Sequence, residues 1–277
     1  MSIIDFLKKK EEHEKSLEEL IKDENVQGES NPRGAFVGFV LLSDARWNLE
    51  NFRYNLLYNW GIQCDDSDED DLKQSLVFSV DDMTAAVSLI PAPIPDGEAE
   101  QNAQNNFMWE NAVATTAQHN AHIMVAVLGE GSYLERAKLL VKLISTCCQA
   151  DNVLGIYSSG TVFEPTIYMH YAEMMKQNLF PIYNLIWFGL YQNEKGVNAY
   201  TYGMNAFDKD EMEVLGTNLE PADLYDFIST LASYVIEYDV TLQDGETIGL
   251  TEDQICPITR SRGVSLTGMT LKIEYYP

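Results

Sequence analysis

The sequence predicts an α+β protein built from two ferredoxin-like halves with mostly antiparallel sheets, preceded by an N-terminal helix. Two observations predict this class. Apolar runs of strand length alternate with stripes of helical spacing in the order of a βαββαβ unit, and this order occurs twice along the 277 residues. The apolar fraction of 45% is ample for a packed core. We therefore expect an amphipathic helix and linker at 1–33, a first half with a connecting helix at 34–150, and a second half at 151–277.

The first half begins with the apolar run Ala35–Leu42, a strong strand pattern. Ser43 or Asp44 can cap the helix that follows, and Gly61 is placed to stop it. Three prolines in Pro91–Pro95 can neither pair in a sheet nor continue a helix, so this segment is expected to be stiff and extended. The other expected elements are helices over Trp47–Trp60, Glu98–His119 and Tyr133–Gln149, and strands at Ser75–Val80, Thr84–Ile90 and His122–Leu128.

The second half is organised around a predicted hairpin in residues 183–215. Tyr183–Tyr191 holds residues that fit a pleated surface, Gln192–Gly196 is a polar turn, and Val197–Met204 alternates between two faces. Phe207–Val214 is expected to leave the hairpin as a turn. The remaining expected elements are a strand at Val153–Tyr157, helices at Glu164–Gln177 and Pro221–Tyr238, and closing strands at Thr247–Leu250 and Met269–Tyr275.

Two polar stretches allow more than one interpretation. Residues 1–30 are rich in Lys and Glu, with two groups of apolar residues, from Ile3 to Leu7 and from Leu17 to Ile21, at helical spacing. Such a helix can dock on a partner or membrane surface, but a helix that lies on its own domain or is half-frayed at the terminus is favoured, because membrane-surface helices are more basic. Asp65–Asp71 lacks the Gly and Glu positions of an EF-hand, so a solvated loop is favoured over a calcium site.

The net charge of −25, from 43 acidic and 18 basic residues, argues against nucleic-acid binding. It would suit a basic partner, but general solubility is the favoured explanation of the charge. No apolar run reaches the ~20 residues of a membrane span, and the start lacks a signal-peptide pattern. The four cysteines have no CxxC spacing, and the adjacent Cys147 and Cys148 are expected to be reduced. Ser158–Gly160 lacks the nucleophile-elbow and Walker patterns, and we predict no cofactor. A cytoplasmic protein is the natural inference.

Six stretches of the chain stand out together: Pro91–Pro95, the Trp109-x-x-Ala112 step, the His119-x-x-His122 pair, the strand ending at Tyr157, Thr201–Val214 and Asp244–Gly249. In this combination they resemble the bacterial family of unknown function DUF4261. The resemblance runs from about Phe36 to Tyr275, and it implies no established activity.

His119 and His122 are the main candidates for acid–base or metal chemistry, because an imidazole with a pKa near ~6.5 changes charge at cellular pH. A zinc site would need two further ligands; Glu110 and Glu135 are available but their spacing does not indicate such a site. The favoured alternative is structural, with His119 at a helix C-terminus and His122 hydrogen-bonded in the core. No catalytic or metal residue is therefore assigned beyond these two candidates.

Asp208, Asp210, Glu211 and Glu213 form an acidic cluster. Paired carboxylates serve glycosidic or metal-assisted reactions, but solvated or partner-facing acids in a turn are favoured here. Arg260–Arg262 is a rare basic spot, expected to hold an internal acidic loop.

These features favour a non-enzymatic binding protein whose acidic surface engages a protein partner, for example a basic toxin that it neutralises as an immunity protein or antitoxin does. The alternative is a small-molecule-binding protein or enzyme with a pocket between the halves, lined by Trp109, His119, His122, Trp187 and Tyr202. The aromatic residues and the acidic cluster are thus the candidate binding residues. A third possibility is a subunit held in a larger assembly by the N-terminal helix, and the oligomeric state stays open.

Overall fold

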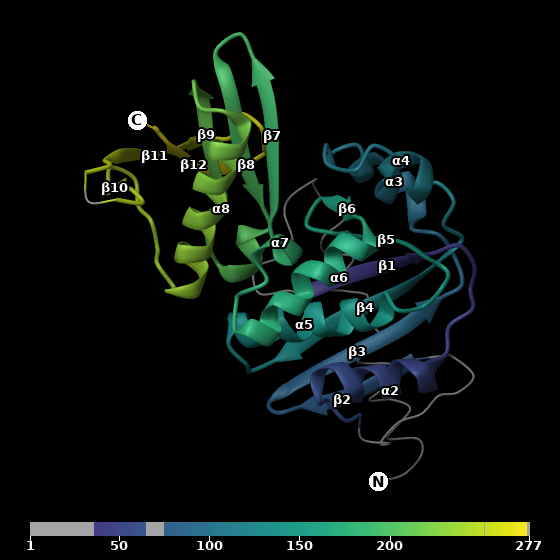
Figure 1. Cartoon of the computed structure of the whole chain (residues 1–277). Helices are drawn as coiled ribbons and strands as arrows, with labels where there is room; N and C mark the ends of the chain where they lie inside the picture. The colour runs from purple at the N-terminus through teal and green to yellow at the C-terminus, as the bar shows by residue number, and fades with distance from the viewer. Residues whose placement is uncertain (1–35, 65–74, 252, 276–277) are drawn as a thin grey trace.

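The protein is seen in a computed structural model that describes residues 36–64, 75–251 and 253–275 (Figure 1). It is a mixed α+β structure with two six-stranded sheets. The predicted N-terminal helix and the acidic run Asp65–Asp71 lie outside the described residues.

The first sheet has the order β2-β3-β4-β1-β5-β6, and its neighbouring strands are all antiparallel. Figure 1 shows α2, α5 and α6 in front of this sheet. Gly61 ends α2 in the left-handed conformation, as predicted, but Asn48 caps the start of this helix instead of Ser43 or Asp44. Ser132 caps α5 through a capping box with Glu135. The elements are β1 (Phe36–Leu42), α2 (Leu49–Trp60), β2 (Ser75–Val80), β3 (Met83–Ile90), β4 (Ala121–Gly129), α5 (Tyr133–Cys147), β5 (Val153–Ser158), β6 (Thr161–Phe163) and α6 (Pro165–Glu173).

The second sheet has the order β10-β11-β12-β9-β8-β7 and contains one parallel pair, between β12 and β9. Helix α8 lies in front of this sheet in Figure 1. Pro221 occupies the first turn of α8, where its missing N–H is tolerated. The elements are the 3-10 turn η2 (Met174–Gln177), α7 (Ile182–Leu185), β7 (Trp187–Asn193), β8 (Gly196–Tyr202), η3 (Met204–Phe207), β9 (Met212–Thr217), α8 (Pro221–Glu237), β10 (Thr247–Ile248), β11 (Cys256–Arg262) and β12 (Met269–Ile273).

The strand order does not confirm the ferredoxin-like duplication. In a βαββαβ unit each helix crosses between parallel strands that flank a third strand. Only α5 does so in the first sheet, since it joins β4 to β5 on either side of β1. The strand predicted to open the second half, Val153–Tyr157, therefore belongs to the first sheet as β5.

The prediction of one long helix over Glu98–His119 is wrong. The segment forms two short helices, α3 (Glu98–Ala103) and α4 (Ala112–Thr116), after a 3-10 turn η1 (Pro95–Gly97). Asparagine side chains between the helices bond to other parts of the chain instead: Asn105 donates to the carbonyl of Gly160 at 2.8 Å, and Asn106 to that of Val162 at 2.9 Å. This competition ends the helix and ties the segment to the β5–β6 hairpin.

One apolar core extends through both sheets. At their junction the ring of Phe207 meets those of Phe36 and Phe180 at centroid distances of 5.3 and 6.1 Å. The Ser159 hydroxyl donates to the carbonyl of Leu185 at 2.7 Å. A cavity of about 10 Å³ remains there, room for one water molecule at most. The junction is thus filled by side chains of the shared apolar core, with little space left between them.

Candidate functional site

The two histidines are buried and bonded to the proline-rich segment. Nε2 of His119 accepts from the backbone N–H of Ile94 at 2.9 Å, and Nδ1 lies 2.6 Å from the carbonyl oxygen of Thr116. Nδ1 of His122 lies 2.8 Å from the carbonyl oxygen of Ala92. Burial lowers the pKa of His122, although the bond to Ala92 acts in the opposite direction. Both rings therefore fix Pro91–Pro95 against the end of the sheet, a structural arrangement.

The candidate aromatic residues do not gather at one place. Trp109 packs on a small second core beneath α3 and α4. Trp187 is buried against the rings of Phe107 and Phe163, at 5.5 and 6.0 Å between centroids. Tyr202 is half-buried at the same junction. These positions, together with the packed junction, leave the predicted pocket between the halves without support.

Glu211 and Glu213 are not partner-facing acids in a turn; both are buried at the start of β9. Glu211 accepts from the Thr201 hydroxyl and the Gly203 N–H, each at 2.7 Å, and burial raises its pKa despite these bonds. Burial also acts to raise the pKa of Glu213, but an ion pair with Lys272 at 2.5 Å and further hydrogen bonds outweigh it, so this pKa is lowered. The Glu211 and Glu213 carboxylates thus connect neighbouring segments of the second sheet.

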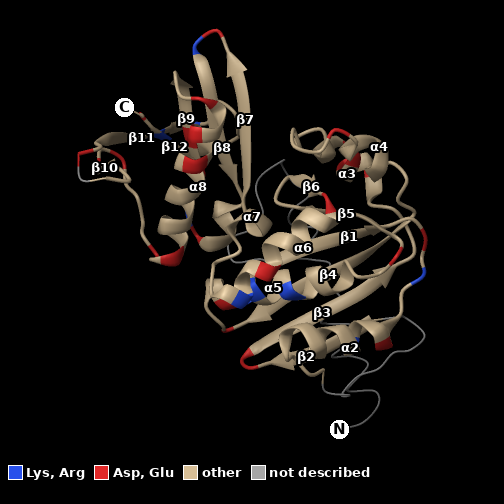
Figure 2. Cartoon of the chain, in the orientation of Figure 1, with Lys and Arg blue, Asp and Glu red and all other residues tan. Residues whose placement is uncertain are grey.

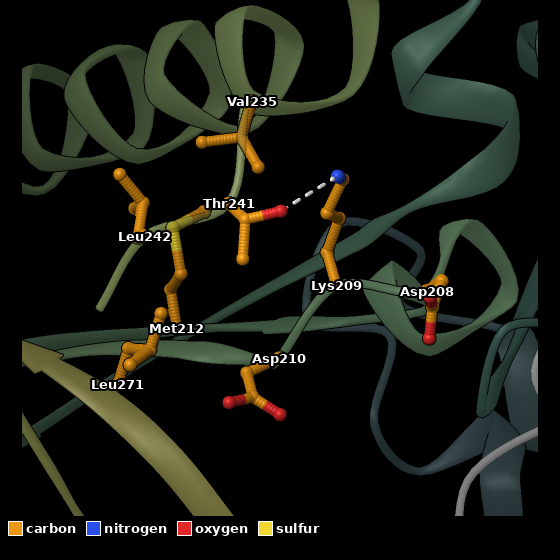
Figure 3. Close-up of a pocket in the computed structure, with 8 residues that line it drawn as sticks. All are labelled: Asp208, Lys209, Asp210, Met212, Val235, Thr241, Leu242 and Leu271. Carbon is orange, nitrogen blue, oxygen red and sulfur yellow. Dashed lines mark hydrogen bonds between the residues drawn. The ribbon is translucent and has the colours of Figure 1, made fainter. Parts of the chain in front are cut away.

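Asp208 and Asp210 instead line a cavity of about 220 Å³ between α8 and the second sheet (Figure 3). Asp208 adopts the left-handed conformation that ends η3, and this turn leads the chain under the helix. The wall and floor of the cavity are aliphatic, formed by Met212 of β9, Val235 of α8, Leu242 and Leu271 of β12. The remaining lining residues are Lys209 and Thr241.

Two of the charged residues at this cavity, Lys209 and Asp210, are held by ion pairs. Nζ of Lys209, whose side chain is almost buried, lies 2.6 Å from a carboxylate oxygen of Asp239 and 3.4 Å from the Thr241 hydroxyl. Figure 3 shows Lys209 directed toward Thr241. Asp210 accepts from Nε of Arg260 at 2.7 Å, and this pairing raises the pKa of Arg260. The prediction that Arg260 holds an internal acidic loop is correct.

The arrangement suits a small group that is both apolar and cationic. Pockets for drug-sized ligands usually measure ~300–1,000 Å³, so about 220 Å³ is enough for a side chain or a fragment. Among the lining groups, the carboxylates of Asp208 and Asp210 outnumber the ammonium of Lys209, which favours a cation, and the aliphatic side chains can pack against a methylene stem. The described residues contain no group of three or more His, Cys, Asp or Glu suited to a metal ion.

The fold and the cavity thus define an α+β protein with a small, acid-rimmed cavity under a helix, and no described helix could cross a membrane. Residues 200–274 match the family model described as Domain of unknown function (DUF4261), which agrees with the resemblance seen in the sequence over this part of the chain. No curated protein and no solved structure matches the chain. Every residue that lines the cavity lies within the matched range.

Sequence reasoning found the two rim acids but missed the rest of the site. Lys209 stood between them in the predicted turn, and its partner Asp239 lies 30 residues further along the chain. The available signal was weak: β9 begins at Met212, and Met212 and Val214 share one face as an alternating apolar pair. That pattern could have placed a strand, and hence a wall, beside the acids.

Proposed function

We propose that this chain is a non-enzymatic binding protein that accepts a basic side chain of a protein partner in the acid-rimmed cavity. Neutralisation of a basic toxin, as an immunity protein or antitoxin performs it, is the role that this binding would serve. The observation that carries the proposal is the combination of an aliphatic floor with carboxylates at the rim, in a cavity of about 220 Å³.

Lysine and arginine side chains have this combination of an apolar stem and a cationic head. Asp208 has a φ of 58° and lies in the turn that ends η3. The residue is exposed, so its carboxylate lies at the surface. The charge of −25 adds long-range attraction for a basic partner. Figure 2 shows acidic residues on several loops around the second sheet, whereas basic residues gather on α5 of the first sheet.

The proposal is tested with n-butylguanidinium, which reproduces the head and stem of arginine. Titration is followed by two-dimensional NMR of the full chain, and a fragment of this size is expected to bind with a Kd on the order of 1 mM, or about −4 kcal/mol. n-Butanol, which lacks the charge, should bind at least tenfold more weakly. Shifted resonances should come from the lining residues Met212, Val235 and Leu271.

Asp208→Asn should weaken the guanidinium but leave butanol binding unchanged. Glu237→Gln serves as the matched control, because Glu237 is the exposed last residue of α8 and is not among the residues lining the cavity. Equal binding of the charged and uncharged ligands, or equal losses in the two variants, would refute the proposal.

A further inference from the structure

The helices over the first sheet carry a group of positive charges, although the chain has a net charge of −25. Lys138 and Lys142 lie on α5, and Lys176 lies on η2, which follows α6. Two of these lysines lie beside Trp60, the last residue of α2. Figure 2 shows basic residues gathered on α5. We call the three lysines and Trp60 the lysine surface; it shares no residue with the lining of the acid-rimmed cavity.

The cations of the lysine surface lie over aromatic rings. Nζ of Lys142 and Nζ of Lys176 are 5.9 and 5.1 Å from the centroid of the Trp60 ring, so the two ammonium groups share one ring. Nζ of Lys138 lies 5.9 Å from the centroid of the Phe180 ring. A ring attracts a cation without neutralising its charge, so the ammonium groups keep both their charge and N–H donors for an anion.

Two of the three lysines have no ion pair within the described residues. Lys176 lies 2.6 Å from a carboxylate oxygen of Glu173, whereas that part of the chain offers no carboxylate at ion-pair distance to Lys138 or Lys142. By contrast, Lys209 at the cavity is paired with a carboxylate at 2.6 Å. The charge of the lysine surface is therefore neutralised only in part by the residues that the structure describes.

The positive charges of the lysine surface repel one another. Lys138 and Lys142 are one helical turn apart on the same face of α5, where like charges destabilise each other. Burial lowers the pKa of Lys142, and the charge of Lys138 lowers it further, although Asp81 acts in the opposite direction. An anion bound between the two ammonium groups would offset this repulsion, so the surface is complementary to negatively charged groups.

The spacing of the two lysines on α5 matches that of carboxylates in an extended peptide. Four residues of an α-helix rise ~6 Å, and side chains at alternate residues of an extended chain are ~6.8 Å apart. We propose that the lysine surface binds an acidic segment of a partner protein, whose carboxylates at alternate residues contact Lys138 and Lys142. A short segment interacts mainly with this local charge, because exposed charges more than ~8 Å apart are screened at physiological ionic strength. The longer phosphate backbone of a nucleic acid would also meet the acidic residues around it.

The probe is an eight-residue peptide in which glutamate alternates with serine, titrated into the full chain. Binding is followed by two-dimensional NMR through the indole N–H of Trp60, whose resonance is assigned by its absence in Trp60→Phe. We expect this resonance to shift, and the affinity to fall several-fold when the salt concentration is raised from about 20 to about 200 mM. Lys138→Gln combined with Lys142→Gln should weaken binding about fivefold, the effect of losing two partly exposed ion pairs.

Two control variants separate the charge of the surface from its fold. Lys138→Arg combined with Lys142→Arg keeps both charges and should bind the peptide as wild type does. Lys195→Gln removes an exposed lysine from the turn between β7 and β8 and should leave the affinity unchanged.

Four outcomes would overturn the proposal. The first is no shift of the Trp60 resonance, and the second is equal binding of a peptide with glutamine in place of glutamate. The third is equal affinity of the double glutamine variant and Lys195→Gln. The fourth is binding that appears only after the six acids of residues 65–71 are changed to serine, because the same chain would then occupy the surface.

Discussion

Replacing Glu213 with glutamine should cost the second sheet about 3–5 kcal/mol of unfolding free energy, the usual effect of breaking a buried ion pair by removing one partner. The carboxylate is fully buried and pairs with Lys272 at 2.5 Å. It also accepts from the N–H groups of Val264 and Ser265, at 3.1 and 2.5 Å, and from the Thr270 hydroxyl at 2.9 Å. A glutamine retains one acceptor oxygen and turns its amide N–H₂ toward these donors, so Lys272 loses its charge partner.

The measurement is urea unfolding at pH 7 followed by tryptophan fluorescence, in a double-mutant cycle with Lys272→Met. Since the double variant no longer contains the unpaired ammonium, it should recover about 1–3 kcal/mol relative to the sum of the single losses. The lowered pKa of Glu213 adds a pH test. The Glu213 carboxylate stabilises the folded state at pH values above its unfolded-state pKa of ~4.3, and this stabilisation is lost as the pH falls through the lower folded-state pKa. The difference in unfolding free energy between wild type and Glu213→Gln should therefore become smaller in acid. This reasoning would be refuted if Glu213→Gln lost less than about 1 kcal/mol of unfolding free energy at pH 7, or if its difference from wild type did not change with pH.

Three further predictions concern single buried groups. Glu211→Gln should leave the free energy of unfolding unchanged or raise it at pH 7, because burial raises the pKa of Glu211 and so disfavours its charged carboxylate. In urea unfolding at a series of pH values, the stability advantage of Glu211→Gln over wild type should shrink as the pH falls toward ~4.3. A large loss of stability in Glu211→Gln at pH 7 would contradict this prediction. His122 has a lowered pKa, so wild-type stability should fall as the pH drops below ~6.5, and His122→Gln should lack this part of the acid loss when melting is compared from pH 8 to 5. Gly203 has a φ of 121°, and a Cβ added there would lie only 2.7 Å from the Leu185 carbonyl oxygen. Gly203→Ala should therefore lower Tm far more than Gly61→Ala, because Gly61 has a φ of 67° and no atom within 4 Å of an added Cβ. Equal shifts of Tm in calorimetry would contradict this packing argument.

The element boundaries that local chemistry sets were predicted well. Strands β1, β2 and β3 and helices α2, α5 and α8 lie within a few residues of their expected ranges, since each combines a clear period with a cap or a turn residue. The hairpin of β7 and β8 was also predicted, although a helical turn, α7, occupies Ile182–Leu185 at its start. Strands β6, β9 and β11 were missed. Strand β6 has only three residues, β9 follows an acidic stretch that was predicted as a turn, and β11 has the polar sequence CPITRSR.

Sheet order and the site were harder to predict because they depend on distant pairings. The alternation of strands and helices is compatible with several topologies, and the choice of β4 rather than β3 as the neighbour of β1 rests on contacts made far along the chain. The acidic cluster shows the same limit. Asp208 and Asp210 reach the surface while Glu211 and Glu213 are buried, and this division follows from β9 being an inner strand between β8 and β12.

The parallel pairing of β12 with β9 has a consequence for the order of events during synthesis. Because β12 lies between β11 and β9, a nascent chain that ends before residue 269 leaves the polar edge of β9 without its neighbour and Glu213 without Lys272. The strands of the first sheet have all been made by residue 163. On the ribosome, we therefore expect that sheet to form while the second waits for its central strand, the interval during which a chaperone would find the most exposed backbone.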